Sequence, residues 1–195
     1  MPSNNSTIRT RKRQLRNQLT RVEQTSHAVG LASQVCRQPA FLNSSRIACY
    51  LANDGEIDPE YIIRSAWKLR KQVYLPVLSP FQSKLYFAPY KAGMAMHINR
   101  FGIPEPACSP AKWVTAWQLD LLLLPLVAFD DNGNRLGMGG GFYDRSLAYR
   151  QSRSRSIRPK LIGLAHELQR EQQLAANSWD IPLEMIATEE RIIKI

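Results

Sequence analysis

The chain has 195 residues and a formal net charge of +10, from 26 lysines and arginines against 16 aspartates and glutamates. This length suits a single α/β domain over residues 1–195, and 44% hydrophobic with 22% charged residues excludes collagen-like and wholly disordered chains. The three cysteines are far apart and form no CxxC pair, which argues against a disulfide framework and a structural zinc site.

Two helices are predicted after residues 1–6, which we expect to be disordered. Thr7 is the predicted N-cap of the first helix, which carries Arg9, Lys12, Arg13 and Arg16. The residues that this helix is expected to bury are Leu15 and Leu19. The spacing of Thr20 and Glu23 is that of a capping box and predicts a second helix to about Arg37. Its predicted apolar face is Val22, Val29, Ala32, Val35 and Cys36. Pro39 ends it.

Strands and helices alternate in the rest of the chain. Apolar patterns predict strands over 46–51, 72–76, 84–88, 119–124, 160–165 and 191–195. Helices are predicted over 58–71 and 141–149, whereas residues 89–118 give no clear assignment. This alternation predicts a mostly parallel sheet with helices on both faces, an α/β fold. Ligands of such sheets bind beyond the carboxyl ends of the strands, where the loop after Leu124 lies.

The longest apolar run, Leu121–Phe129, has nine residues and is too short to span a bilayer. The basic N-terminus has no apolar stretch behind it, so it is not a secretory signal. We therefore expect a cytoplasmic protein without membrane contact.

The positive charge is concentrated in two segments, residues 1–40 and 145–160, each with a net charge of +6. Such segments indicate a polyanionic partner, which could be nucleic acid, a nucleotide or an acidic small molecule. The alternative is an ordinary solvated surface.

A glycine-rich loop follows the most apolar strand. Gly137, Gly139, Gly140 and Gly141 fall within five residues. Such a turn before a helix presents unpaired backbone N–H groups and forms a phosphate cradle. The spacing is neither that of a Walker A loop nor that of a Rossmann fingerprint. A plain flexible turn is the alternative.

Charged residues flank this loop. Arg135 can reach a phosphate, and Asp144 lies in the first turn of the following helix, where Mg²⁺ can join a carboxylate to phosphate oxygens. Asp144 could instead favour the helix dipole or pair with Arg145. Asp180 is a second candidate metal ligand, or the cap of the turn at Pro182.

Glu56 follows the first strand and could accept hydrogen bonds from the N–H groups of a heterocycle, or be an exposed turn acid. The three histidines, His27, His97 and His166, show no metal-ligand spacing and are given no role. There is no GxSxG elbow or Ser-His-Asp order to support a hydrolase.

Several segments together resemble one family, the bacterial 5-formyltetrahydrofolate cyclo-ligases. The resemblance covers residues from about Lys12 to Glu189 and is carried by the segments 12–16, 55–58, 75–76, 102–106, 120–125, 128–130, 135–145, 179–180 and 188–189. The pattern RLGMGGGFYDR over 135–145 is its most specific part.

This resemblance implies a three-layer α/β/α fold of the type found in ribose-phosphate isomerases and CoA transferases. It implies conversion of 5-formyltetrahydrofolate, possibly polyglutamated, into 5,10-methenyltetrahydrofolate with ATP and Mg²⁺. The implied ATP-binding residues are Lys12, Arg16, Arg135, Leu136, Gly137, Met138, Gly139, Gly140, Gly141, Phe142 and Tyr143. The implied substrate contacts are Leu51, Glu56 and Met138 to Phe142. Arg135 and Asp144 are the implied catalytic residues, and Asp144 and Asp180 the implied magnesium ligands.

The chain departs from the family pattern at two positions. Phe142 stands where tyrosine is frequent, and Gly140 where some relatives carry lysine. Without that lysine, the groups expected to neutralise the γ-phosphate charge are Arg135, Lys12, Arg16 and the metal.

The chemistry needs no covalent nucleophile. Phosphorylation of the formyl oxygen creates a leaving group on an activated iminium carbon, and the neighbouring amine closes the ring. We expect a monomer that binds no nucleic acid. The rival functions are a basic nucleic-acid-binding protein and a sugar-phosphate isomerase or CoA transferase on a similar fold.

Overall fold

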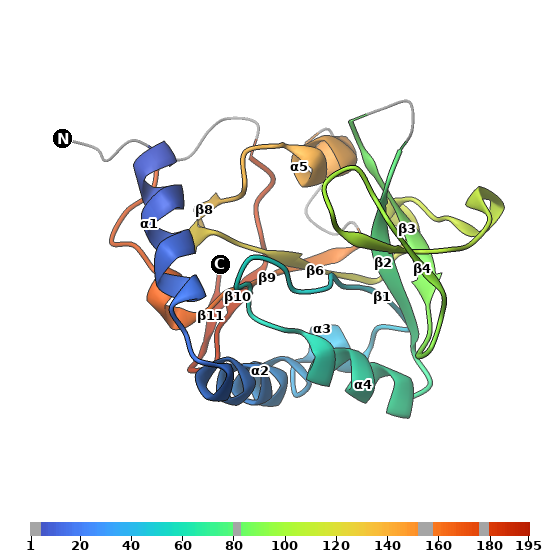
Figure 1. Cartoon of the computed structure of the whole chain (residues 1–195), viewed down its shortest axis with the longest axis horizontal. Coiled ribbons are helices and arrows are strands. Elements are labelled where there is room, and N and C mark those ends of the chain that lie inside the picture. Colours follow the sequence, from blue (N-terminus) through green and yellow to red (C-terminus); the bar gives the residue numbers. More distant parts are fainter. Residues whose placement is uncertain (1–4, 80–82, 152–157, 176–179) are drawn as a thin grey trace.

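The computed structural model describes residues 5–79, 83–151, 158–175 and 180–195. Its centre is a seven-stranded sheet in the order β11-β10-β9-β6-β1-β2-β3 (Figure 1). These strands are β1 (Arg46–Ala48), β2 (Gln72–Leu78), β3 (Leu85–Tyr90), β6 (Leu121–Pro125), β9 (Lys160–Leu164), β10 (Met185–Ala187) and β11 (Ile192–Lys194). The strands from β10 to β2 run parallel, and β11 and β3 pair antiparallel at the two edges. The mostly parallel sheet predicted from the sequence is confirmed.

Helices and two small antiparallel pairs surround this sheet. The helices are α1 (Asn5–Asn17), α2 (Arg21–Val35), α3 (Pro39–Leu42), α4 (Glu60–Lys68), α5 (Phe142–Leu147) and the 3-10 turns η1 (Pro110–Lys112), η2 (Ala116–Gln118), η3 (Ala148–Arg150) and η4 (Glu167–Gln169). The pairs are β4 (Met96–Ile98) with β5 (Pro104–Pro106), and β7 (Ala128–Phe129) with β8 (Arg135–Leu136). In the described ranges, none of the helices combines the length and apolar character that crossing a bilayer requires.

Strand β6 is buried on both faces. Leu121 and Leu123 pack with buried side chains of α2 and α4, whereas Leu122 and Leu124 pack with Leu147 of α5 on the opposite face. Figure 1 shows α2 and α4 below the sheet and α5 above it. A strand with both faces covered needs apolar residues at every position, which explains the unbroken leucine run. The carboxyl end of β6 leads into the β7–β8 hairpin and then the glycine-rich loop.

Helix α1 differs from its prediction. It begins at Asn5, so Asn5 and Ser6 are helical rather than disordered, and residues 1–4 lie outside the described part. It buries Ile8, Lys12 and Arg16, whereas Leu15 is 39% exposed. The expected burial of Leu15 is therefore wrong. The physical reason is that α1 packs against η4 and β7, where backbone carbonyl oxygens accept hydrogen bonds from Lys12 and Arg16. The polar face of the helix is therefore the buried one.

Helix α2 begins as predicted, with the reciprocal capping box of Thr20 and Glu23. Its buried face is different from the predicted one, because Val22 is 79% and Val29 is 50% exposed. The residues that it buries are Ala28, Leu31 and Val35. The helix has apolar residues on more than one face. The face that contains Leu31 is buried because it is the one in contact with α4 and β10.

Several other boundaries are corrected. Pro39 is the first residue of α3 and not only the end of α2. Strand β1 stops at Ala48, three residues before the expected end. Strand β10, the hairpin β7–β8 and the elements between 96 and 118 were not predicted. All of these are short, and short elements carry little periodicity.

Candidate active site

The glycine-rich loop joins β8 to α5. The backbone is left-handed at Gly139 (φ +93°) and at Gly141 (φ +62°), and Gly141 is the N-cap of α5. Only glycine adopts such angles readily, so these two glycines are required by the path of the chain. Asp144 lies in the first turn of α5, as predicted. The loop thus has the backbone conformation that a close approach to phosphate needs.

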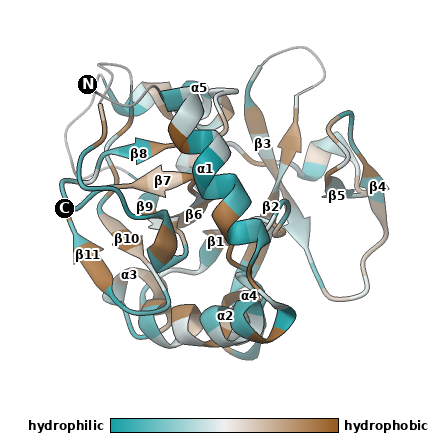
Figure 2. Cartoon of the chain, turned by 60° about the vertical axis from the view of Figure 1, so that its left-hand side comes forward, coloured by the Kyte–Doolittle hydropathy of each residue, from teal (hydrophilic) through white to brown (hydrophobic). Residues whose placement is uncertain are grey.

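Two arginines from different helices hold the loop. Arg9 of α1 donates its Nε–H to the carbonyl oxygen of Gly137 at 2.8 Å, and its guanidinium carbon lies 3.6 Å from a Cβ placed on Gly139. Arg145 of α5 donates to the carbonyls of Gly140 at 2.5 Å and Ser83 at 2.7 Å. Figure 2 shows the largely hydrophilic α1 beside β7 and β8. Arg9 and Arg145 were not among the predicted site residues, although both lie in the basic segments.

Arg135 is the centre of the charged part of the site. The Arg135 side chain is 9% exposed and the Asp144 side chain is 29% exposed. Nη2 of Arg135 lies 2.5 Å from Oδ1 of Asp144. Arg135 also donates to the carbonyl of Ile181. Burial lowers the pKa of Arg135, and the charges of Asp144 and Asp180 oppose that effect. Asp144 thus pairs with Arg135 rather than with Arg145, and the charge of Asp180 acts on the same arginine. The roles of the two carboxylates as magnesium ligands stay predictions.

Lys12 and Arg16 are bonded to protein oxygens. The ammonium of Lys12 donates to the carbonyls of Leu168 and Arg170, each at 2.7 Å. Arg16, with no exposed surface, donates to the backbone carbonyl of Asp54 at 2.7 Å and pairs with its carboxylate at 2.9 Å. These contacts attach α1 to the body of the protein. Contact of either side chain with ATP stays a prediction.

Glu56 lies in the segment between β1 and α4, as does the half-buried Leu51. Burial raises the pKa of Glu56 to about 7, and Arg16 opposes the shift. The side chain is half-buried, so it is not an ordinary exposed turn acid. Its charge contributes to raising the pKa of Tyr143, after the larger effect of burial. The loop residue Tyr143 and Glu56 therefore lie within electrostatic reach of each other.

A cavity of about 540 Å³ lies beside Glu56. Its walls come from the end of α1, from α2 and from the segment 52–61. The volume falls in the range of small-molecule sites. Four acidic residues, Asp54, Glu56, Asp58 and Glu60, and one basic residue, Arg21, line it, so acceptors for N–H donors predominate in its walls.

The other side chains of the loop include three apolar residues, Leu136, Met138 and Phe142. Met138 is 53% exposed and Leu136 is 6% exposed. The ring of Phe142 meets that of Phe101 edge-on, with centroids 5.8 Å apart, and the Arg145 guanidinium lies 5.3 Å from its centroid. A Cβ on Gly140 would lie 3.0 Å from the Phe142 ring. A lysine at that position would therefore displace this ring. Residues 152–157 of the second basic segment and Trp179 lie outside the described residues.

The chain is similar to known proteins over almost its whole length. Residues 2–189 match the family model described as the 5-formyltetrahydrofolate cyclo-ligase family. A 5-formyltetrahydrofolate cyclo-ligase of Haemophilus influenzae is 43% identical over 184 residues, which is 90% of this chain and 92% of that one. A protein of the same name from Escherichia coli K12 is 37% identical, with 92% and 97% of the two chains covered.

A solved structure shares the fold. The NMR structure of Aquifex aeolicus 5,10-methenyltetrahydrofolate synthetase superposes with a TM-score of 0.80 and 26% identity, over 97% of this chain and 92% of that one. Both the family and the enzyme class inferred from the sequence are thus confirmed. Because the sequence matches and the fold match extend over nearly the whole chain, the chain belongs to the 5-formyltetrahydrofolate cyclo-ligase family.

Proposed function

We propose that the protein converts 5-formyltetrahydrofolate, with or without a polyglutamate tail, into 5,10-methenyltetrahydrofolate. ATP is the co-substrate, and ADP and phosphate are the other products. One observation carries the proposal: a loop with left-handed glycines lies beside the ion pair of Arg135 and Asp144. The monomeric state, the cytoplasmic location and the need for Mg²⁺ belong to the same proposal.

The phosphates of ATP bind along the main chain of the loop 135–143 in this proposal. The left-handed glycines have no side chains of their own to cover the backbone, and Arg9 and Arg145 place positive charge beside it. Lys12 would exchange a carbonyl partner for a phosphate oxygen. Arg16 would support the site indirectly, because it donates a hydrogen bond to the backbone carbonyl of Asp54 and so holds that segment in place.

Asp144 and Asp180 are the carboxylates that would hold Mg²⁺. The charges of both act on Arg135, and carboxylate oxygens are the ligands that Mg²⁺ prefers. When bound, the ion would neutralise charge on the phosphate oxygens. Arg135 already occupies one oxygen of Asp144, which orients the other.

The reaction has two steps in this proposal. The formyl oxygen of the substrate attacks the γ-phosphorus of ATP, and ADP leaves. The N10 amine then attacks the activated formyl carbon, loses its proton, and phosphate leaves as the ring closes. Catalysis consists of holding the formyl oxygen in line with the γ-phosphorus and of stabilising the charge that develops there. Arg135 supplies a preorganised cation for that charge.

The folate is placed against Leu51, Glu56 and the loop residues from Met138 to Phe142. The ionised carboxylate of Glu56 would accept hydrogen bonds from N–H groups of the pteridine ring. Phe142, with its edge toward Phe101, offers a ring face for stacking. The absence of a hydroxyl at Phe142 limits that residue to apolar contact.

The direct test is incubation of the protein with 5-formyltetrahydrofolate, ATP and Mg²⁺. The near-ultraviolet absorbance of the methenyl product is followed, and ADP is quantified in parallel. We expect one ADP for each methenyl group formed. Turnover that continues after both nucleotide and divalent metal have been removed would contradict the proposal.

A further inference from the structure

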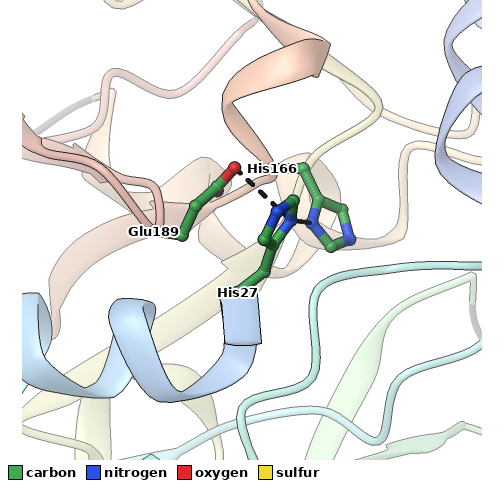
Figure 3. Close-up of side chains that lie close together, drawn as sticks. All are labelled: His27, His166 and Glu189. Carbon is green, nitrogen blue, oxygen red and sulfur yellow. Dashed lines mark hydrogen bonds and ion pairs between the residues drawn. The ribbon is translucent and has the colours of Figure 1, made fainter. Parts of the chain in front are cut away.

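Three residues far apart in the sequence meet beside the sheet. His27 lies on α2, His166 is the N-cap of η4, and Glu189 follows β10. Nδ1 of His27 lies 2.8 Å from Nδ1 of His166 and 3.4 Å from Oε1 of Glu189. Figure 3 shows His27 between the other two side chains. Their ligand atoms all lie within 4.8 Å of one another.

We propose that His27, His166 and Glu189 bind a divalent transition-metal ion, with Zn²⁺ as the best match. This site is separate from the carboxylates around Arg135 and does not depend on the proposed reaction. Two imidazoles and a carboxylate are a known zinc ligand set, in which the remaining position holds water. Nitrogen donors also select against Mg²⁺, which prefers oxygen ligands.

The backbone brings the three side chains together. Helix α2 approaches the turn after β10 closely at Gly30, where a Cβ would lie 2.9 Å from the carbonyl oxygen of Glu189. Gly30 is three residues after His27, so the two share one face of the helix. The backbone N–H of His166 donates to the fully buried Gln169 at 2.9 Å. The positions are therefore fixed by packing and not only by attraction between the side chains.

The protonation of His166 suits a ligand. Its Nε2 lies 3.2 Å from the carbonyl oxygen of Gly55. A carbonyl only accepts hydrogen bonds, so Nε2 carries a proton, and in the neutral ring the lone pair of Nδ1 points toward His27. A neutral imidazole whose other nitrogen donates to a carbonyl is typical of metal ligands.

The carboxylate of Glu189 is oriented in the same way. The backbone N–H of Glu167 donates to its two oxygens, at 3.2 and 3.0 Å. Ligating carboxylates usually hold such supporting hydrogen bonds. The side chain of His27 is 22% exposed, which gives an ion and its water ligand a route from solvent.

The separations are close to those of a tetrahedral site. Ligand atoms at about 2.0–2.1 Å from zinc lie about 3.3 Å from each other. The contact of His27 with Glu189, at 3.4 Å, already has this value. The two histidines, at 2.8 Å, are at hydrogen-bonding distance, so a ring shift of about half an ångström would replace the shared proton by the ion.

Bound metal would connect three segments of the fold. It would join α2 to the ends of β9 and β10, and through His166 it would reach Gly55, the neighbour of Glu56. We expect a higher thermal midpoint in the metal-bound protein, because only the folded chain assembles the three ligands.

The test uses the full-length protein, stripped of metal with a chelator and kept reduced with a phosphine. It is titrated with Co²⁺ in excess Mg²⁺, followed by displacement with Zn²⁺. We expect one equivalent of Co²⁺ to give visible d–d bands without the near-ultraviolet band of thiolate ligation. His27→Gln and Glu189→Gln should each weaken binding by about tenfold or more.

Matched controls separate this site from others. His97→Gln removes a histidine that lies outside the cluster, beside Glu105, and Cys36→Ser removes the thiol at the C-cap of α2. Both should bind Co²⁺ as the unmodified protein does. Circular dichroism reports whether each variant folds, and His27→Gln changes only a half-buried position. Failure of the unmodified protein to bind, or equal binding by folded His27→Gln, would show that the histidines form only a hydrogen bond.

Discussion

Asp144 and Arg135 form an ion pair across the glycine-rich loop, with 2.5 Å between Oδ1 and Nη2. Arg135 is almost fully buried, so its charge depends on this partner. The pair therefore has two roles in the proposed reaction: it fixes the cation proposed to face the phosphates, and it orients the carboxylate proposed to hold Mg²⁺.

Asp144→Asn should reduce turnover by about 10²–10³ and raise the Mg²⁺ concentration needed for half-maximal rate, because asparagine keeps the shape but removes the charge. Asp131→Asn is the matched control, since that carboxylate pairs with Arg170 on the surface. Turnover is measured against Mg²⁺ concentration, alongside the thermal midpoint. A normal rate and an unshifted Mg²⁺ dependence would remove Asp144, and with it Asp180, from the metal site.

Gly139→Val should abolish ATP binding and leave the sheet folded. The side chain would cover the backbone and strain a left-handed residue. Gly141→Val should act likewise, because its Cβ would meet Arg145 at 2.7 Å. The matched control is Gly93→Val, at another left-handed glycine with open space around it. Calorimetry with ATP decides the matter: unchanged affinity in both loop variants would make the loop an ordinary turn.

Glu56 predicts a pH dependence of folate binding. Its pKa is about 7 in the protein without folate, so the carboxylate that accepts N–H hydrogen bonds forms only as the pH rises through that value. The KM for 5-formyltetrahydrofolate should increase as the pH falls from 8 to 6. Glu56→Gln should raise KM and remove most of this dependence. The same pH profile in Glu56→Gln would assign the dependence to another group.

The same carboxylate makes a prediction about stability. A carboxyl whose pKa is raised on folding binds its proton more tightly in the native state, so its contribution lowers stability as the pH rises from about 4.5 to about 7. Glu56→Gln should therefore stabilise the protein at pH 8, by at most on the order of 3 kcal/mol. Urea unfolding at pH 5 and pH 8 measures the difference. A variant that is less stable at pH 8 would contradict this expectation.

Arg9→Ala should raise the KM for ATP, because the guanidinium is held beside Gly137 and Gly139. Arg11→Ala is the matched control: it removes the same charge from the same helix, at a side chain that pairs with Glu171. Initial rates at varied ATP concentration compare the two. Equal KM values for ATP would show that the net charge of α1, and not the position of Arg9, matters.

The sequence predicted six of the seven strands of the central sheet and missed β10, which has only three residues. Long apolar runs and clear helix starts were the strongest signals. The run Leu121–Leu124 and the capping box at Thr20 are signals of this kind. The face of α1 was mispredicted, since hydrophobic patterning assumes that helices bury apolar residues. Here Lys12 and Arg16 are buried, because oxygen atoms surround them. Such compensation depends on residues distant in sequence and leaves no periodic pattern.

The charged part of the site was predictable in part. Arg135 and Asp144 lie in one motif, so their proximity followed from the sequence. The contact of Arg9 with Gly137 joins residues 128 positions apart, and the pairing of His27 with His166 joins residues 139 apart. No short-range spacing could indicate either contact. Both contacts form because α1 and α2 dock against segments that lie far along the chain.

The attachment of α1 also has a consequence for synthesis of the protein. Lys12, near the start of the chain, is bonded to carbonyls of Leu168 and Arg170, which leave the ribosome more than 150 residues later. Arg9 can hold the glycine loop only after this docking. A nascent chain that lacks the region of η4 offers α1 only part of its docking surface, because the carbonyl partners of Lys12 are missing. Nucleotide binding should therefore appear late in biosynthesis.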